Sequence, residues 1–260
     1  MNWWQAIVLG IVQGLTEFLP VSSSGHLAIG RELLGVGAGG DLVFEVAVHA
    51  ATAIAIIVVF WKEILRLLGG LFKFRYNEET KYILKICLSM IPVFIVGVFF
   101  KDYVEVAFGS LLVVGIGLVV TGILLALSDG VKKQGEEISF WQALVIGLGQ
   151  ALAVIPGLSR SGTTISTGLL CGVKRESVAQ FSFLMVLVPV LGEAFLDVVG
   201  GEVASSSTAV IPLILGFIAA FASGLLACKA MIALVKRAKM KWFALYCAVV
   251  GVIVIISQIS

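Results

Sequence analysis

QGLTEFLPVSSSGH, residues 13–26, is a polar stretch inside strongly apolar sequence, and a second copy, QALAVIPGLSRSGT, occupies residues 150–163. A shift of 137 residues aligns the copies with ten identities over the 23 positions from Trp4 to His26, which indicates an internal repeat. Hydroxyl, carboxylate, imidazole and guanidinium groups are costly in hydrocarbon, so their presence at membrane depth predicts a functional site. We expect the two copies to face each other and to form one site.

The composition is typical of a polytopic membrane protein. Hydrophobic residues make up 60% of the chain and charged residues 13%, and the mean hydropathy is +1.10. Six apolar runs are each near the ~20 residues that cross ~30 Å of hydrocarbon. These runs are residues 42–61, 83–100, 108–128, 178–199, 209–228 and 242–259. The sequence therefore predicts an all-α protein with six transmembrane helices, and no nucleic-acid partner is expected.

The two polar motifs each separate apolar stretches that are too short to cross the bilayer alone. The stretches are residues 3–19 and 25–35 around the first motif, and 140–155 and 162–172 around the second. A helix, a break and a second short helix predict a re-entrant helical hairpin, which enters and leaves the membrane on one side. Because non-helical backbone at membrane depth must be buried in protein or line a wet cavity, we expect the hairpin tips to line a cavity.

The distribution of Lys and Arg predicts an orientation, since short cytoplasmic loops collect these residues. If the loop after the first span is cytoplasmic, fifteen basic residues fall inside and only Arg31 and Lys101 outside, whereas Arg160 lies in the second motif. The loop at residues 200–208 has no basic residue and is expected outside.

Each half of the chain, residues 1–130 and 138–260, contains one hairpin (residues 3–35 or 140–172) and three spans. Three is odd, so the halves are predicted to form an inverted-topology repeat within one membrane domain. The hairpin tips would then meet near the midplane, as in many inverted-repeat transporters.

The second motif has the groups that a phosphate site needs. Arg160 is the only basic residue predicted at membrane depth, and its planar guanidinium can make bidentate contact with phosphate oxygens. Hydroxyls and the N–H groups at the starts of the half-helices would complete a cradle for an anion. The residues expected to bind phosphate are Ser22, Ser24, Gly25, Ser159, Arg160, Ser161, Gly162, Thr163 and Thr164.

The first motif has the reactive groups. Ser22, Ser23 and Ser24 are nucleophile candidates, Glu17 is a candidate base, and His26 is a candidate base or acid. On a helix, Glu17 shares a face with Gln13 at i, i+4 spacing.

The stretch QGLTEFLPVSSSGHL with the downstream PGLSRSGTT resembles the bacterial undecaprenyl-diphosphate phosphatases, the BacA-like integral membrane enzymes. The resemblance covers essentially the whole chain. It implies that the protein removes the terminal phosphate of the polyprenyl lipid undecaprenyl diphosphate and so recycles the lipid carrier of cell-wall synthesis. It also implies a multi-pass protein of the bacterial plasma (inner) membrane, in contact with membrane lipids, whose active site opens to the outer, periplasmic face.

The resemblance also implies roles for single residues. From the residues we expect the catalytic set to be Glu17, Ser23, His26 and Arg160, and the resemblance favours Ser23 as the nucleophile, with attack by His26 or by an activated water as the alternatives. The family's first motif has an acidic pair in which Glu or Gln is accepted at the first position, and here the pair is Gln13 and Glu17. A divalent cation, Mg²⁺ or Ca²⁺, is plausible beside a diphosphate, with Glu17 and Gln13 as its ligands.

Other interpretations compete with these roles. Inverted repeats with broken helices also occur in transporters, so a transporter or lipid flippase is the alternative function. Ser22 and Ser159 could equally cap half-helices, and Arg160 could be a structural partner of Glu17. His49, in the first span, is interpreted as a packing histidine.

Overall fold

The structure is a computed structural model that describes residues 1–36, 42–131, 135, 137–200, 209–237 and 239–259. These residues are helical, apart from turns and an isolated β-bridge between Gly135 and Val173. The expected all-α class is therefore confirmed. The 200–208 loop, expected on the outer side, lies almost wholly outside the described residues.

The helices follow the two halves of the chain. The helices of the first half are α1 (Trp3–Phe18), α2 (Ser23–Leu33), α3 (Leu42–Val59), α4 (Trp61–Leu71), α5 (Glu78–Phe99), α6 (Lys101–Phe108) and α7 (Leu111–Asp129). Those of the second half are α8 (Phe140–Leu152), α9 (Arg160–Leu170), α10 (Arg175–Gly200), α11 (Val210–Arg237) and α12 (Lys241–Ile259).

Five helices in the described part of the chain are long and apolar enough to cross a membrane, namely α5, α7, α10, α11 and α12. They overlap five of the six predicted spans. The remaining predicted span, residues 42–61, falls on α3 and the start of α4, which meet at Phe60 with a bend of 77°. This pair gives a sixth crossing only if the two helices are counted together.

The two motif hairpins, α1–α2 and α8–α9, are held by the same hydrogen bonds. Gln5 Nε2 donates to the carbonyl oxygen of Leu34 at 3.0 Å, and Gln142 Nε2 donates to that of Cys171 at 3.0 Å. Each glutamine also accepts from the main-chain N–H of its helix N-cap. The donors and acceptors are related by the 137-residue shift, so the internal repeat of the sequence is also a repeat of local structure.

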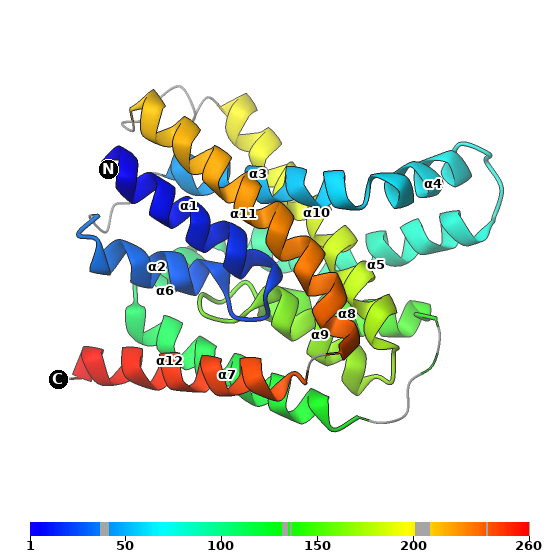
Figure 1. Cartoon of the computed structure of the whole chain (residues 1–260). Coiled ribbons are helices and arrows are strands. Elements are labelled where there is room, and N and C mark those ends of the chain that lie inside the picture. Colours follow the sequence, from blue (N-terminus) through cyan, green and yellow to red (C-terminus); the bar gives the residue numbers. More distant parts are fainter. Residues whose placement is uncertain (37–41, 132–134, 136, 201–208, 238, 260) are drawn as a thin grey trace.

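The halves of the chain pack into each other rather than side by side. Helix α1 lies along α11 of the other half, α8 lies along α5, and α7 lies along α12 (Figure 1). Glycines allow these close approaches: a Cβ on Gly10 would lie 2.3 Å from the carbonyl oxygen of Gly216. The repeat-related Gly147 meets the carbonyl oxygen of Ser89 in the same way, at 2.4 Å.

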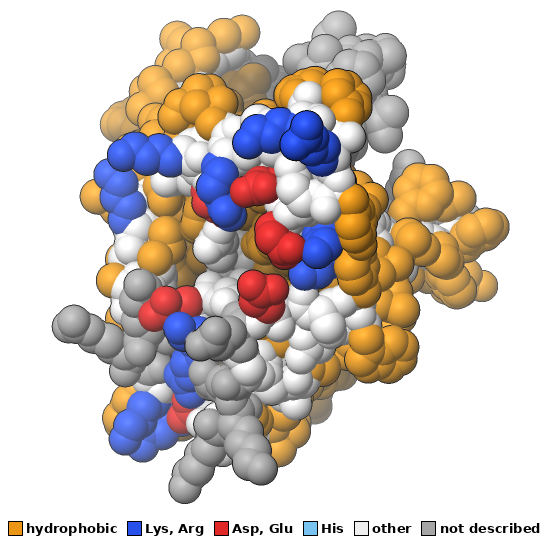
Figure 2. Space-filling model, turned by 90° about the vertical axis from the view of Figure 1, so that its right-hand side faces the viewer, with side chains coloured by type: hydrophobic (Ala, Val, Ile, Leu, Met, Phe, Trp, Pro, Cys, Tyr) orange, Lys and Arg blue, Asp and Glu red, His pale blue; other side chains and the backbone are white. Residues whose placement is uncertain are grey.

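The two hairpins approach the middle of the molecule from opposite ends. In Figure 1 the α1–α2 hairpin runs in from the left, beside the N-terminus, and α8 runs in from the right. The tips touch, because Ser161 Oγ donates to the carbonyl oxygen of Leu19 at 3.1 Å. The face at the right of Figure 1 is rich in Lys and Arg (Figure 2).

The close contact at Gly10 gives a stability prediction. Gly10→Ala should lower the thermal unfolding temperature in detergent, because the methyl group would overlap backbone of α11 and such overpacking costs about 1–3 kcal/mol. Gly97→Ala in α5 is the matched control, since a Cβ there meets no atom within 4 Å. Equal shifts of the two unfolding temperatures would contradict the packing described here.

Candidate functional site

The carboxylate of Glu17, in the last turn of α1, is surrounded by polar side chains of both motifs and of α3. Its side chain is only 8% exposed. Oε2 accepts hydrogen bonds from Ser23 Oγ at 2.5 Å and from Gln13 Nε2 at 3.0 Å. The expectation that Gln13 and Glu17 share one helix face is therefore confirmed, and Ser23 is the serine of the first motif that contacts the carboxylate.

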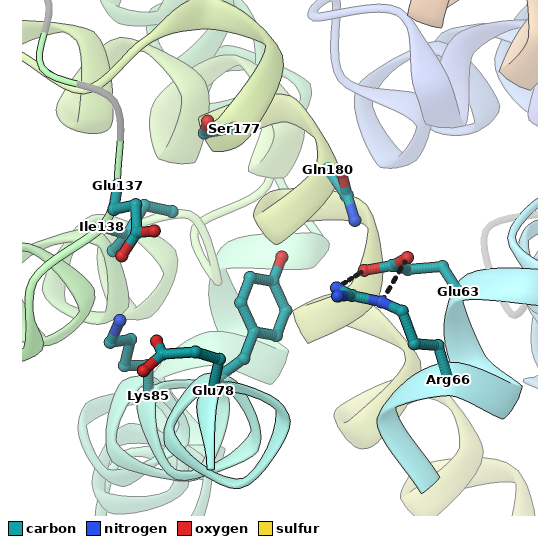
Figure 3. Close-up of a pocket in the computed structure, with 9 residues that line it drawn as sticks. Glu63, Arg66, Glu78, Lys85, Glu137, Ile138, Ser177 and Gln180 are labelled. Carbon is teal, nitrogen blue, oxygen red and sulfur yellow. Dashed lines mark hydrogen bonds and ion pairs between the residues drawn. The ribbon is translucent and has the colours of Figure 1, made fainter. Parts of the chain in front are cut away.

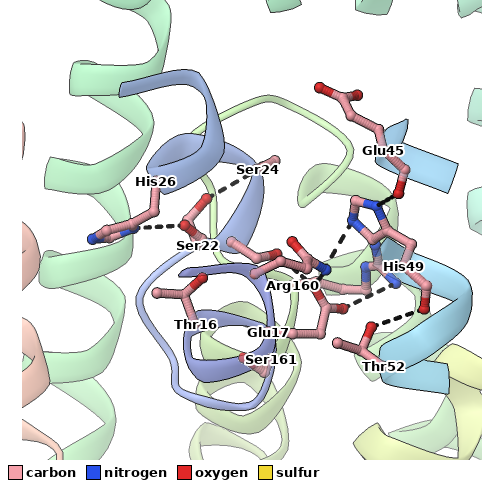
Figure 4. Close-up of polar contacts among 12 residues, drawn as sticks. Thr16, Glu17, Ser22, Ser24, His26, Glu45, His49, Thr52, Arg160 and Ser161 are labelled. Carbon is pink, nitrogen blue, oxygen red and sulfur yellow. Dashed lines mark hydrogen bonds and ion pairs between the residues drawn. The ribbon is translucent and has the colours of Figure 1, made fainter. Parts of the chain in front are cut away.

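Two basic side chains from other parts of the fold approach the same carboxylate (Figure 4). Arg160 Nη1 lies 3.9 Å from Glu17 Oε1, and His49 Nε2 lies 3.9 Å from Glu17 Oε2. Arg160 begins α9 as Ser23 begins α2, and the 137-residue shift superposes these two positions. The repeat therefore directs one residue from each tip to a single acidic group.

Ser22 shapes the first tip. Its φ of +70° is unfavourable for a residue with a side chain, and strain of this kind is found mainly at functional sites. Its hydroxyl caps α2 by accepting from the N–H of Gly25 at 3.2 Å, and it lies 3.4 Å from Ser24 Oγ. The capping interpretation of Ser22 is thus confirmed, and three of the expected phosphate-binding residues lie together at the start of α2.

His26 points away from Glu17 (Figure 4). Its Nδ1 bonds the carbonyl oxygen of Ser22 at 2.8 Å, and its Nε2 bonds the hydroxyl of Tyr246 on α12 at 2.7 Å. The two rings are also stacked, with centroids 5.6 Å apart. The structure therefore does not bring His26 into the group of side chains around the carboxylate.

The second tip is built in the same way as the first. Ser159 Oγ caps α9 by accepting from the N–H of Gly162 at 3.0 Å, and it lies 3.3 Å from Ser161 Oγ. Thr164 instead faces α10, where its hydroxyl bonds Ser182 Oγ at 2.6 Å. Thr163 is 2% exposed and its Oγ1 has no hydrogen-bond partner.

Thr121 on α7 holds the second tip in place, although the sequence analysis did not single it out. Its Oγ1 accepts from the N–H of Ser159 at 2.9 Å and lies within hydrogen-bonding distance of the carbonyl oxygens of Gly117 and Gly157. Gly157 has a φ of +86°, which favours glycine, and its Cα packs against the main chain of α7. The available signal was a hydroxyl residue near the middle of an apolar span.

Buried polar atoms without hydrogen-bond partners are concentrated in the two motifs. Native interiors contain few such atoms, and each one needs a physical explanation. Five are found among the described residues, and four of them belong to the two motifs: Gln13 Oε1, Gln150 Oε1, Arg160 Nη1 and Thr163 Oγ1. Gln13 and Arg160 are both next to Glu17, so a polar ligand beside this carboxylate would supply partners for their two atoms.

The Gln13 and Glu17 pair is compatible with a divalent cation. Mg²⁺ and Ca²⁺ bind carboxylate and amide oxygens, and the unpartnered Gln13 Oε1 belongs to the residue that hydrogen-bonds Glu17. No group of three or more His, Cys, Asp or Glu residues in the described ranges could hold a metal ion. Most ligands of a cation here would therefore have to come from substrate and water.

The two half-helices that begin at the tips differ in burial. In α9 eight of 11 residues are buried, against the neighbours α7, α8 and α10. In α2 only Gly25 and Leu27 are buried, and the helix packs mainly on α1 and α7. The site is therefore covered on the side of the second hairpin and less covered on the side of the first.

A separate cavity of about 340 Å³ lies on the basic face of the molecule, between α4, α5 and α10 (Figures 2 and 3). Its lining mixes charges: the acidic residues are Glu63, Glu78 and Glu137, and the basic ones are Arg66 and Lys85. Two hydrogen bonds, of 3.1 and 2.6 Å, join Arg66 to Glu63. None of the residues predicted for the site lines this cavity.

Known proteins are similar to this chain over almost its whole length. The family model described as bacitracin resistance protein BacA matches residues 6–253. An undecaprenyl-diphosphatase of Bacteroides fragilis is 54% identical over 266 residues, with 100% of both chains covered. Proteins of the same name from Parabacteroides distasonis and Carboxydothermus hydrogenoformans are 56% and 37% identical, and the alignments cover at least 98% of each chain.

The role of Thr121 can be tested by stability. Thr121→Val should lower the thermal unfolding temperature, because the buried N–H of Ser159 would lose its acceptor at a cost of about 1–3 kcal/mol. Thr121→Ser keeps the hydroxyl and should restore most of the loss. A Val variant as stable as the Ser variant would show that this hydrogen bond does not hold the tip.

Proposed function

This chain belongs to the family of the bacitracin resistance protein BacA, and on that premise we propose that it is an undecaprenyl-diphosphatase. It is a membrane hydrolase that converts undecaprenyl diphosphate to undecaprenyl phosphate and phosphate. The product is the lipid carrier of cell-wall synthesis, which the reaction recycles.

One observation supports the proposal most directly: the two hairpin tips meet at a buried carboxylate, beside a guanidinium with an unpartnered nitrogen. Phosphoryl transfer depends mainly on positioning and on stabilisation of negative charge. Arg160 can contact two phosphate oxygens at once, and the hydroxyls and N–H groups at both helix starts add further donors.

The geometry favours Ser23 as the nucleophile. Its hydroxyl hydrogen-bonds Glu17 at 2.5 Å, so the carboxylate can take the proton as Ser23 Oγ attacks the terminal phosphorus. The bond from phosphorus to the bridging oxygen breaks, and undecaprenyl phosphate leaves with that oxygen. Glu17 passes the proton to that oxygen and is a carboxylate again. It then deprotonates a water that attacks the phosphorus, the bond to Ser23 Oγ breaks, Ser23 regains its proton from Glu17, and phosphate is released. In the alternative, Glu17 activates water for direct attack and Ser23 orients it.

A divalent cation is proposed to bind beside Gln13 Oε1 and the Glu17 carboxylate, together with diphosphate oxygens. When bound, such a cation neutralises charge on the phosphates. Gln13 also orients Glu17 through the 3.0 Å hydrogen bond, whether or not a cation is bound.

The proposed membrane arrangement is an inverted repeat of residues 1–130 and 138–260. Each half has three crossings, α3–α4 being one of them, and a re-entrant hairpin, residues 3–35 or 140–172. The first hairpin enters from the periplasmic face of the bacterial plasma membrane. The poor burial of α2 supports an opening there, and the basic face at the opposite end supports a cytoplasmic position for that end.

Transport of a lipid across the membrane is the second candidate function. The cavity on the opposite face favours it, because a transporter needs access from both sides. Phosphate release separates the candidates. Purified protein in detergent should release phosphate from undecaprenyl diphosphate. A protein that moves this lipid across a membrane but releases no phosphate would overturn the proposed hydrolysis.

Arg160 gives the first activity prediction. Arg160→Ala should lower kcat/KM by about 10³-fold or more, which is the scale seen when a charge-stabilising arginine is lost in phosphoryl transfer. Arg160→Lys should recover little, because an ammonium is a point charge without the planar fork. Near-normal turnover of the Lys variant would remove the argument for bidentate contact.

The Gln13 and Glu17 pair gives the second. Glu17→Gln should lower kcat by about 10²- to 10⁴-fold, because the amide cannot accept the proton of Ser23. Gln13→Ala should cost far less, about tenfold, because it leaves the base in place and removes one orienting hydrogen bond and one neutral oxygen of the proposed cation site. Equal losses would mean that the two residues act as one unit. Titration of both variants and of the unchanged chain with Mg²⁺ would then test cation binding.

A further inference from the structure

We infer that His49 is a substrate-binding residue, which hydrogen-bonds the terminal phosphate together with Arg160. The inference rests on the proposed function, because it concerns the same site. Nothing in the sequence around His49 pointed to this role, since the residue stands in an apolar span and was interpreted as packing.

The ring of His49 is held with one nitrogen fixed and the other free. Nδ1 bonds the main-chain carbonyl oxygen of Glu45, one turn earlier on α3, at 2.8 Å. A carbonyl can only accept, so Nδ1 carries the proton of that bond; Nε2 then accepts from a phosphate hydroxyl when the ring is neutral and donates to a phosphate oxygen when the ring is an imidazolium. Nε2 has no hydrogen-bond partner among the described residues and faces Glu17. The ring can therefore reach a ligand only through Nε2.

The position of α3 is itself tied to the first hairpin. The carboxylate of Glu45 forms an ion pair with Arg31 on α2. Thr52 adds a local bond, from its hydroxyl to the carbonyl oxygen of His49 at 2.8 Å. His49 is thus presented to the tip by a helix that is attached to the same half-helix as Ser23.

The distances around Glu17 leave room for a ligand atom. His49 Nε2 and Arg160 Nη1 both lie 3.9 Å from the carboxylate, beyond the 2.7–3.2 Å of an N–H···O hydrogen bond. Neither group is engaged by Glu17 at hydrogen-bonding distance. A phosphate group beside the carboxylate could contact both nitrogens, and the guanidinium of Arg160 would offset its charge against that of Glu17.

The other histidine does not compete for this role. The chain contains two histidines, and both ring nitrogens of His26 already bond protein atoms, at Ser22 and Tyr246. Of the two, His49 is the one with a free nitrogen next to Ser23, Glu17 and Arg160. This assigns to His49 a phosphate contact that spacing within the motifs could not reveal.

The test compares side chains that keep or lose a hydrogen-bonding group at this position. His49→Gln places an amide near Nε2, His49→Asn is one methylene shorter, and His49→Leu has no polar group. Ile54→Val, on the same helix but with an exposed side chain, is the matched control. For each variant, kcat, KM for undecaprenyl diphosphate and the inhibition constant for inorganic phosphate are measured, together with thermal unfolding.

The expected result is a loss of about 10- to 100-fold in kcat/KM for His49→Leu, as for a lost hydrogen bond to a charged group, with a parallel rise in the phosphate inhibition constant. His49→Gln should stay within about threefold of the unchanged chain, His49→Asn should resemble His49→Leu, and Ile54→Val should leave phosphate inhibition unaltered. If His49→Leu does not fold, the comparison of Gln with Asn decides.

Two results would overturn the inference. One is an unchanged phosphate inhibition constant in the Leu or Asn variant, and the other is a Gln variant as impaired as the Asn variant. Failure of the proposed function would look different, because the unchanged chain would then release no phosphate from undecaprenyl diphosphate.

Discussion

The burial of one carboxylate, Glu17, is the constraint on which the site depends. A charged group at membrane depth is costly unless it is paired and hydrogen-bonded, and Glu17 obtains its partners from α1, α2, α3 and α9. The two hydrogen bonds come from the first half of the chain and the guanidinium of Arg160 from the second, so the carboxylate has its full set of partners only when the two hairpin tips meet.

The two hairpin tips have the same backbone arrangement but different functional side chains. Both half-helices start with a serine cap three residues before a glycine N–H, which leaves further N–H groups directed at the point where the tips meet. The side chains then diverge. Ser23 is matched by Arg160, Glu17 by Val154 and His26 by Thr163, so one tip has the reactive groups and the other has the positive charge. A symmetric scaffold thus holds an asymmetric site, as a reaction with distinct nucleophile and phosphate positions requires.

The two half-helices differ in burial, so the site is more accessible beside α2 than beside α9. Helix α9 is enclosed by α7, α8 and α10, and Thr121 fixes the loop that precedes it. Helix α2 has fewer neighbours and is joined to α3 by the Arg31–Glu45 ion pair. In the function proposed here, the lipid approaches beside the less enclosed helix, and Arg160 on the enclosed one would anchor its phosphate.

The amino-acid sequence by itself determined the helical class, the span positions, the hairpin breaks and the i, i+4 pairing of Gln13 with Glu17. These features depend on local properties: the length of an apolar run, the Pro, Gly and Ser residues that interrupt it, and the periodicity of a helix. Only the tertiary structure decided that His49 lies at the carboxylate, that His26 turns to Tyr246, that Thr121 holds the second tip and that the first span bends at Phe60. Such outcomes depend on contacts between residues far apart in the chain and on the direction of each side chain, and no local pattern encodes either.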